Sequence, residues 1–94
     1  MAHWMIEQVL FALGDAELEL RQAQAEIHVT SDGEASVYCT DKSIVVSVQY
    51  TDSASYLEVA VERYDRNGYS TGWKFGPPRY TPESAFVDIL DALH

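Results

Sequence analysis

Two stretches between residues 43 and 64 alternate in side-chain polarity with the period of a β-strand. Every second position is apolar or aromatic: Ile44, Val46, Val48 and Tyr50 in the first stretch, and Leu57, Val59 and Val61 in the second. This period of two is typical of strands with one packed face and one solvent-facing side. The link at residues 52–55 is small or polar, and it is too short for the helix of a parallel crossover. The stretches therefore predict a β-hairpin within an antiparallel sheet.

Further strands are expected on both sides of this hairpin. Residues 26–30 and 35–40 alternate in the same way around a turn signal at residues 31–34. Beyond the hairpin, residues 67–68 are an Asn-Gly pair, which is preferred where two successive residues need a positive φ. We therefore expect the chain to return as a strand over residues 69–75, which the two prolines that follow would end.

Helices are predicted near both ends of the chain. Residues 3–13 carry four apolar side chains at the spacing of a helix stripe: Ile6, Val9, Leu10 and Leu13. Gly14 is a plausible stop for this helix. Later in the chain, Thr81 and Pro82 are typical of the N-cap and first position of a helix. The same spacing follows them: Phe86, Ile89, Leu90 and Leu93.

Residues 15–24 fit two patterns. Leu18 and Leu20 alternate with charged residues as in an amphipathic strand, whereas Ala16, Leu20 and Ala23 continue the period of the first helix. Residue propensities favour a helix, which is the structure we expect.

The pattern as a whole predicts a single α+β domain over residues 1–94. It has an antiparallel sheet of four or five strands, with the N- and C-terminal helices packed on one face. Apolar residues make up 47% of the chain, which is ample for a core. A chain of this size buries about 60% of its unfolded surface and can fold alone.

The sequence favours a cytoplasmic location. It has no apolar run near the roughly 18 residues that span a bilayer, and residues 1–4 lack the basic region of a signal peptide. The only cysteine is Cys39, so no intramolecular disulfide can form. We expect neither membrane insertion nor a cysteine-rich metal site.

The net charge of −9 is concentrated in the first two-thirds of the chain. Residues 1–62 hold eleven acids against two bases, whereas residues 63–94 hold four of each. Such acidity argues against direct binding of nucleic acid phosphates and is compatible with a basic protein partner. Acidity that only keeps the protein soluble is the alternative.

No set of side chains in the sequence converges on a catalytic or metal site. Glu58 and Glu62 share a strand face, but four residues of strand separate them by about 13 Å, beyond the spacing of a glycosidase acid pair. The histidines have no metal-ligand spacing: His3, His28 and His94. Cys39 alternates in register with Val37, which indicates a buried small residue. We expect no enzyme activity, no cofactor and no bound metal.

The solvent-facing side of the sheet is the first candidate binding surface. Alternation places His28 there together with six acidic or tyrosine residues: Glu26, Tyr38, Tyr56, Glu58, Glu62 and Tyr64. Tyrosine rings supply contact area and carboxylates steer a basic partner, so we predict that these six residues bind a protein. The alternative is that tyrosine is simply a good strand residue.

Two other stretches carry exposed aromatic candidates. Residues 63–80 gather four bases with Trp73, Phe75 and three tyrosines, a composition that can bind single-stranded nucleic acid, although the acidity of the chain opposes this. Trp73 and Phe75 would otherwise belong to the core.

In the first helix, Trp4 and Phe11 fall nearly opposite the apolar stripe. They are either sandwiched in the fold or form a dimer or partner surface.

In size, acidity and lack of a catalytic motif, the chain resembles small inhibitors encoded by phages and mobile elements, including anti-CRISPR proteins. The resemblance is one of build across the whole chain, and it transfers no site residues. It implies a non-enzymatic inhibitor that docks on the nucleic-acid-binding surface of a protein partner.

Two further functions fit the same features. A bacterial immunity protein or a secretion chaperone can share this size and acidity. A small ligand-binding domain or enzyme would instead require a closed pocket with converging polar groups around Cys39 or Trp73.

Overall fold

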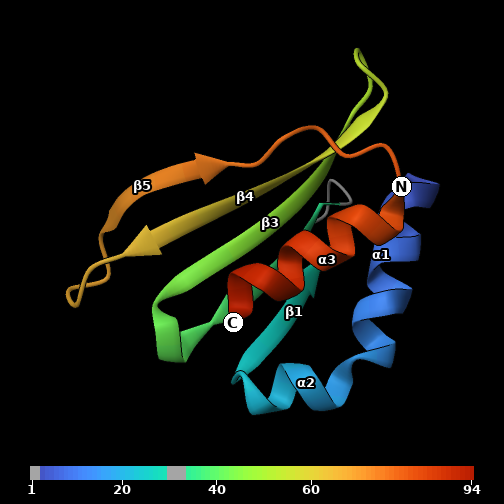
Figure 1. Cartoon of the computed structure of the whole chain (residues 1–94). Coiled ribbons are helices and arrows are strands. Elements are labelled where there is room, and N and C mark those ends of the chain that lie inside the picture. Colours follow the sequence, from blue (N-terminus) through green and yellow to red (C-terminus); the bar gives the residue numbers. More distant parts are fainter. Residues whose placement is uncertain (1–2, 30–33) are drawn as a thin grey trace.

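A computed structural model of the chain describes residues 3–29 and 34–94 (Figure 1). In chain order its elements are α1 (Trp4–Asp15), α2 (Glu17–Gln22), β1 (Ala25–Val29), β2 (Ala35–Cys39), a 3-10 turn (Thr40–Lys42), β3 (Ile44–Thr51), β4 (Tyr56–Tyr64), β5 (Ser70–Phe75) and α3 (Pro82–Leu93). Among the described helices, none is long and apolar enough to cross a membrane.

The strands form one antiparallel sheet in the order β1-β2-β3-β4-β5. The predicted α+β class and antiparallel sheet are therefore confirmed, with five strands. The hairpin of β3 and β4 is the longest ladder, running from the pair Ile44 and Arg63 to the pair Thr51 and Tyr56. The turn predicted at residues 31–34 lies outside the described residues, apart from Glu34.

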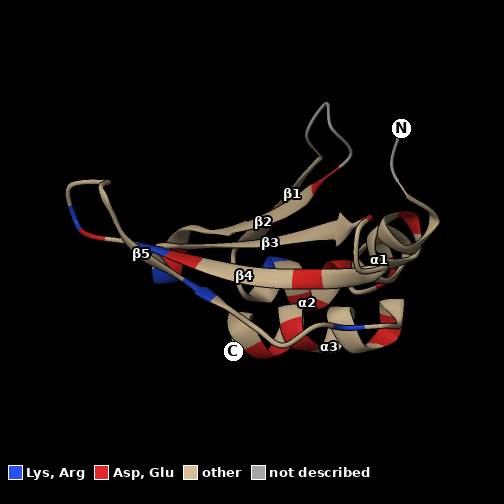
Figure 2. Cartoon of the chain, turned by 90° about the horizontal axis from the view of Figure 1, so that it is seen from above, with Lys and Arg blue, Asp and Glu red and all other residues tan. Residues whose placement is uncertain are grey.

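The core lies between the sheet and the helices. Figure 2 shows α3 running along one side of β4, and both α1 and α3 contact β3. The buried core cluster draws on every helix and on three strands: Met5, Ile6, Val9, Leu13, Leu20, Ala35, Val37, Cys39, Ile44, Val46, Val48, Leu57, Val59, Ala85, Ile89 and Leu93. Three of the four residues of the first predicted helix stripe and two of the four residues of the second are among these residues, because alternate strand positions and helix stripes meet in one layer.

Residues 15–24, which fitted two patterns, are helical for most of their length. α1 runs one residue past Gly14, and Ala16 separates it from the six-residue helix α2. Leu20 is buried whereas Leu18 is exposed, as in a helix with one apolar position against the core.

The turn between β4 and β5 differs from the expected one. Gly68 has a φ of +85°, but Asn67 does not have a positive φ, so the expectation of two successive positive φ values is wrong. The side chain of Asp65 closes the turn instead, because its Oδ1 accepts hydrogen bonds from the backbone N–H groups of Asn67 (2.9 Å) and Tyr69 (3.0 Å). The pairing of β4 with β5 has a register shift between Arg63 and Tyr64, next to this turn.

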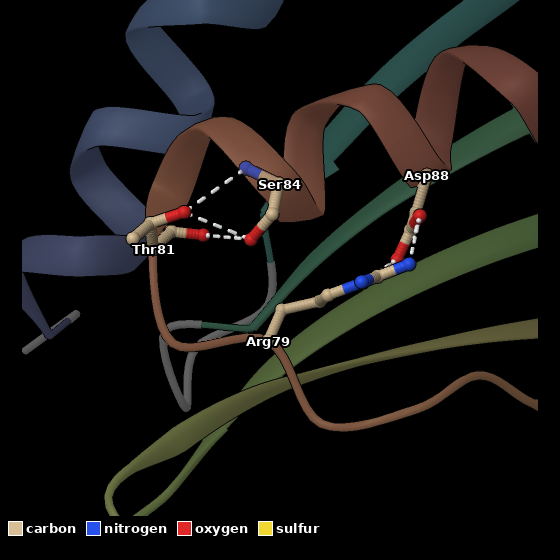
Figure 3. Close-up of polar contacts among 4 residues, drawn as sticks. All are labelled: Arg79, Thr81, Ser84 and Asp88. Carbon is tan, nitrogen blue, oxygen red and sulfur yellow. Dashed lines mark hydrogen bonds and ion pairs between the residues drawn. The ribbon is translucent and has the colours of Figure 1, made fainter.

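The connection from β5 to α3 is fixed near the start of α3. The backbone N–H and C=O groups of Arg79 pair with those of Leu57 on β4, at 2.9 and 2.7 Å. Its guanidinium donates from Nε to Oδ2 of Asp88 (2.5 Å) and from a terminal nitrogen to Oδ1 (2.9 Å) (Figure 3). Oγ1 of Thr81 accepts from the N–H of Ser84 at 3.3 Å, which confirms the predicted N-cap.

Candidate protein-binding surface

Each strand turns alternate side chains away from the core. In β3, for example, Val46 belongs to the core cluster, whereas its neighbour Val45 is buried outside that cluster. We call this side the open face. By the pairing register, its strand residues are Glu26, His28, Ser36, Tyr38, Val45, Ser47, Gln49, Thr51, Tyr56, Glu58, Ala60, Glu62, Tyr64, Trp73 and Phe75.

The register brings together three of the six predicted partner-binding residues in one row across the sheet. Glu26 is paired with Tyr38, Tyr38 with Val45, Val45 with Glu62, and Glu62 with Trp73. Glu26, Tyr38 and Glu62 therefore share a line that crosses all five strands and ends on an aromatic residue.

The other three predicted residues lie on β4 at different ends of the open face. The hydroxyl of Tyr64 donates a hydrogen bond to Oε1 of Glu62, so these two side chains form a pair. Glu58 accepts from Nε2 of Gln49 at 3.2 Å. Tyr56 lies at the far end, where its ring meets that of Tyr80 edge to face at 6.1 Å. Tyr56 is thus separate from the Glu62 row.

Hydrogen bonding perturbs one phenol of the open face. The bond from Tyr64 to Glu62 raises the pKa of the Tyr64 phenol above its ordinary value, with smaller contributions from desolvation and from the negative charge of Glu62. The phenol therefore stays protonated, and donates to this carboxylate, over the whole physiological range.

Charge is sorted between the two sides of the sheet. All the carboxylates within the described strands lie on the open face, namely Glu26, Glu58 and Glu62. The only lysine and arginine residues within these strands, Arg63 and Lys74, occupy positions of the opposite register and line a hollow with Asp88 and Asp91. Figure 2 shows the corresponding red bands on β4 and blue bands near and on β5.

The open face ends in two aromatic side chains that the sequence left unassigned. Trp73 and Phe75 are 49% and 59% exposed, so the alternative that placed them in the core is wrong. Their rings lie 6.1 Å apart at an angle of 18°. The alternation within β5 does not signal this exposure, because Gly72, Lys74 and Gly76 on the opposite face offer no apolar side chain for helices to cover.

A shallow hollow of about 240 Å³ lies beside these rings. It is lined by Glu34, Ser47, Gln49, Glu58, Ala60, Trp73 and Phe75. Of these residues, only Glu58 is among the six that the sequence predicted to bind a partner. The small and amide side chains of Ser47, Ala60 and Gln49 give no binding signal in a sequence.

The aromatic and basic residues of the stretch 63–80 are brought together only in part, since Phe75 lines a hollow with Arg63 and Lys74 but Trp73 does not. Trp73 and Lys74 are neighbours in β5 and therefore face opposite sides of the sheet. The guanidinium of Arg79 is held by Asp88. The stacked rings thus have acids rather than bases beside them on the open face.

The first helix carries a separate exposed aromatic pair. Trp4 is 60% and Phe11 69% exposed, so the alternative in which they are sandwiched within the fold is wrong. A second hollow, lined by Glu7, Leu10 and Phe11, lies on this helix.

The remaining polar candidates contact neighbouring groups of the chain. Cys39 is buried in the core, and its thiol donates to the carbonyl of Ala23 at 3.2 Å. Nδ1 of His3 accepts from the N–H of Met5 at 3.2 Å, and its ring stacks on that of Tyr50. His28 lies 3.5 Å from a carboxylate oxygen of Glu26 on the edge strand. Within residues 3–29 and 34–94, no group of three His, Cys, Asp or Glu side chains could hold a metal ion.

Comparison of the chain with protein-family models, curated proteins and solved structures finds no match. The candidate site therefore rests on the arrangement of this chain's own side chains.

Proposed function

We propose that this protein is a non-enzymatic binding module that docks its open face on a basic surface of a protein partner. The observation that carries the proposal is the sorting of charge within the sheet, with Glu26, Glu58 and Glu62 on the open face and the strand bases on the other side. Like-charged groups gathered on one face steer an oppositely charged partner and repel wrong ones.

Exposed rings on the same face support a docking role rather than a solubilising one. Tyr38, Trp73 and Phe75 are all more than 40% exposed there. Tyrosine, tryptophan and phenylalanine are enriched at interface cores, where they supply apolar area that carboxylates cannot.

The partner we propose is a protein that binds nucleic acid through Lys and Arg side chains. Such a surface complements an acidic face, and covering it would block access of the phosphates. The protein would thus act as a small inhibitor, in the manner of the phage and mobile-element inhibitors it resembles in build, without contacting nucleic acid itself. An immunity protein or secretion chaperone would use the same face on a toxin or effector.

We place this function in the cytoplasm. The only cysteine is an unpaired, buried thiol, which is compatible with a reducing compartment.

The proposal is tested by capture of partners from a host lysate, treated with nuclease, on the tagged protein. The double variant Glu58→Lys, Glu62→Lys reverses charge on the open face. The matched control, Glu19→Lys with Asp91→Lys, makes the same charge change at exposed helix positions. We expect a basic partner to bind the wild type and the control but not the open-face variant. Equal capture by all three proteins would refute docking through this face.

Self-association through α1 is a second candidate. It is favoured by the exposure of Trp4 and Phe11 on one helix beside a hollow. Sedimentation of the double variant Trp4→Ala, Phe11→Ala should then give a lower mass than the wild type, whereas Leu18→Ala on α2 should not. A wild-type protein that sediments as a monomer at every concentration would exclude this role.

A further inference from the structure

We infer that the hollow beside Trp73 and Phe75 receives one arginine side chain of the protein partner. This inference rests on the proposed function and assigns a specific contact to its docking face. It draws on the shape of the hollow, on the groups that line it and on their charge.

The pairing register of three strands creates the hollow. Ser47 is paired with Ala60, and Ala60 with Phe75, so two small side chains form a floor next to an aromatic wall. Glu58 and Gln49 are paired with each other, two residues away from Ala60 and Ser47 on the same strands. They form a second side of the hollow. Because the side chains of serine and alanine are shorter than those of the surrounding phenylalanine, glutamine and glutamate, the surface is lower above the serine and the alanine.

The size of the hollow suits the end of an arginine side chain. Its volume of about 240 Å³ equals the share of about eight water molecules in the liquid, at about 30 Å³ each. A guanidinium with its neighbouring methylene groups has a comparable number of heavy atoms.

The aromatic wall matches the flat, delocalised charge of a guanidinium. Trp73 and Phe75 lie within 18° of parallel, remain about half exposed, and both line the hollow. A cation within about 6 Å of a ring centroid is attracted by the ring, and arginine makes this contact more often than lysine.

The polar side of the hollow offers an acceptor for the same cation. Oε1 of Glu58 is held by Nε2 of Gln49, which orients the carboxylate. In the described part of the chain, no hydrogen bond or ion pair involves Oε2 of Glu58. Arginine donates to carboxylates through a rigid fork of N–H groups, so one guanidinium can stack on the wall and bond to Glu58.

Other occupants fit the lining less well. Two carboxylates, Glu34 and Glu58, and no base line the hollow, which disfavours an anion. A purely apolar side chain would remove water from Glu58 without replacing its hydrogen bonds. A lysine ammonium is a compact charge that cannot use the flat wall as fully as a guanidinium.

The experiment uses three short peptides that differ only in one residue type. Each contains three copies of arginine, lysine or citrulline separated by glycine and serine, and citrulline has the shape of arginine without its charge. Dissociation constants are measured by nuclear magnetic resonance titration. In a Trp4→Phe background, Trp73 is the only tryptophan, so its fluorescence reports binding at the wall itself.

We expect the arginine peptide to bind about tenfold more tightly than the citrulline peptide and about threefold more tightly than the lysine peptide. It should also change the Trp73 fluorescence. Glu58→Gln should weaken arginine binding by about tenfold, whereas Glu19→Gln on α2 should not. Trp73→Leu should abolish the preference for arginine over lysine, and Trp73→Tyr, which keeps a ring, should retain part of it.

Equal binding of the arginine and citrulline peptides would overturn the inference. So would an arginine preference that survives Trp73→Leu, since the preference would then arise elsewhere. Thermal unfolding shows whether each variant folds. If Trp73→Leu does not fold, the preference of Trp73→Tyr for arginine over lysine decides whether the ring is the receptor. If the lysate partner is lost by charge reversal while the peptides are not distinguished, docking holds and the arginine receptor is wrong. If the peptides are distinguished but no basic partner binds, the proposed function is wrong.

Discussion

Glu62 lies directly opposite Trp73 across the β4 and β5 ladder, on the open face. Residues paired in this way have Cβ atoms about 4.5–5.5 Å apart, so a carboxylate and an indole ring occupy the same site on the sheet. In the proposed docking, the group that would attract a basic partner is thus adjacent to the group that would supply contact area once the partner has arrived. A long-range and a short-range contribution to binding would then be combined at one point.

The first prediction concerns the electrostatic steering of a basic partner. Reversing charge at Glu58 and Glu62 should slow association with the captured partner by about tenfold or more at low salt, because steering rests on these carboxylates. The difference should shrink as salt is raised, since screening shortens the reach of exposed charges to about 8–10 Å near physiological ionic strength. Stopped-flow mixing at several salt concentrations measures the rates.

The control for this prediction is the variant Glu19→Lys, Asp91→Lys, which has the same net charge. It should associate much faster than the open-face variant, and both should unfold at nearly the wild-type temperature. Equal association rates for the two variants would mean that only net charge matters.

Much of the fold was predictable from the sequence because local patterns and tertiary packing agree in it. The alternation of Ile44, Val46 and Val48 identified β3, and Thr81 with Pro82 identified the start of α3. Residues 15–24 were ambiguous, because alternating leucines and helical spacing coincide in a short segment. Packing of Leu20 against the core favours the helix.

The candidate site was only partly predictable. Glu58, Glu62 and Tyr64 share a face by alternation alone, and the structure places them so. Trp73 joins them only through the register between β4 and β5, which depends on the turn at Asp65 and on the shift at Arg63 and Tyr64. A shift of one residue would move every β5 side chain to the other face, and no local pattern in the sequence fixes it.

The second prediction follows from the raised pKa of Tyr64. Because its hydrogen bond to Glu62 raises the phenol pKa in the folded state, the folded chain keeps this proton to higher pH than the unfolded chain. The contribution of this bond to stability is therefore complete below about pH 10 and is lost as the pH rises through the folded pKa. The free energies of unfolding of wild type and Tyr64→Phe should converge above about pH 10, as measured by urea denaturation.

Glu62→Ala provides the control, because it keeps the phenol but removes the group that accepts its hydrogen bond. In that background, Tyr64→Phe should no longer produce a convergence at high pH. A stability difference between wild type and Tyr64→Phe that stays constant to about pH 11 would contradict the assigned cause.

The third prediction separates the core from the helix surface. Leu57 is fully buried between the sheet and the helices, and Leu57→Ala should lower the free energy of unfolding by about 2–5 kcal/mol through lost contacts and a cavity. Val87 on α3 is 52% exposed, and Val87→Ala should change the free energy of unfolding by no more than about 0.5 kcal/mol. Urea denaturation of both variants measures this, and similar losses would mean that α3 packs through a different face.

The last prediction concerns the clamp between Arg79, in the connection before α3, and Asp88, within α3. Arg79→Met keeps most of the apolar stem but removes both charged hydrogen bonds, so the connection should be held less firmly against β4. The amide protons of Leu57 and Arg79, which bond to each other's carbonyls, should exchange faster with solvent. Arg21→Met breaks the exposed pair of Arg21 with Glu17 on α2 and should leave these amides unchanged, because exposed pairs on one helix contribute little. If exchange at Leu57 is the same in both variants, the backbone pairing rather than the guanidinium holds the start of α3.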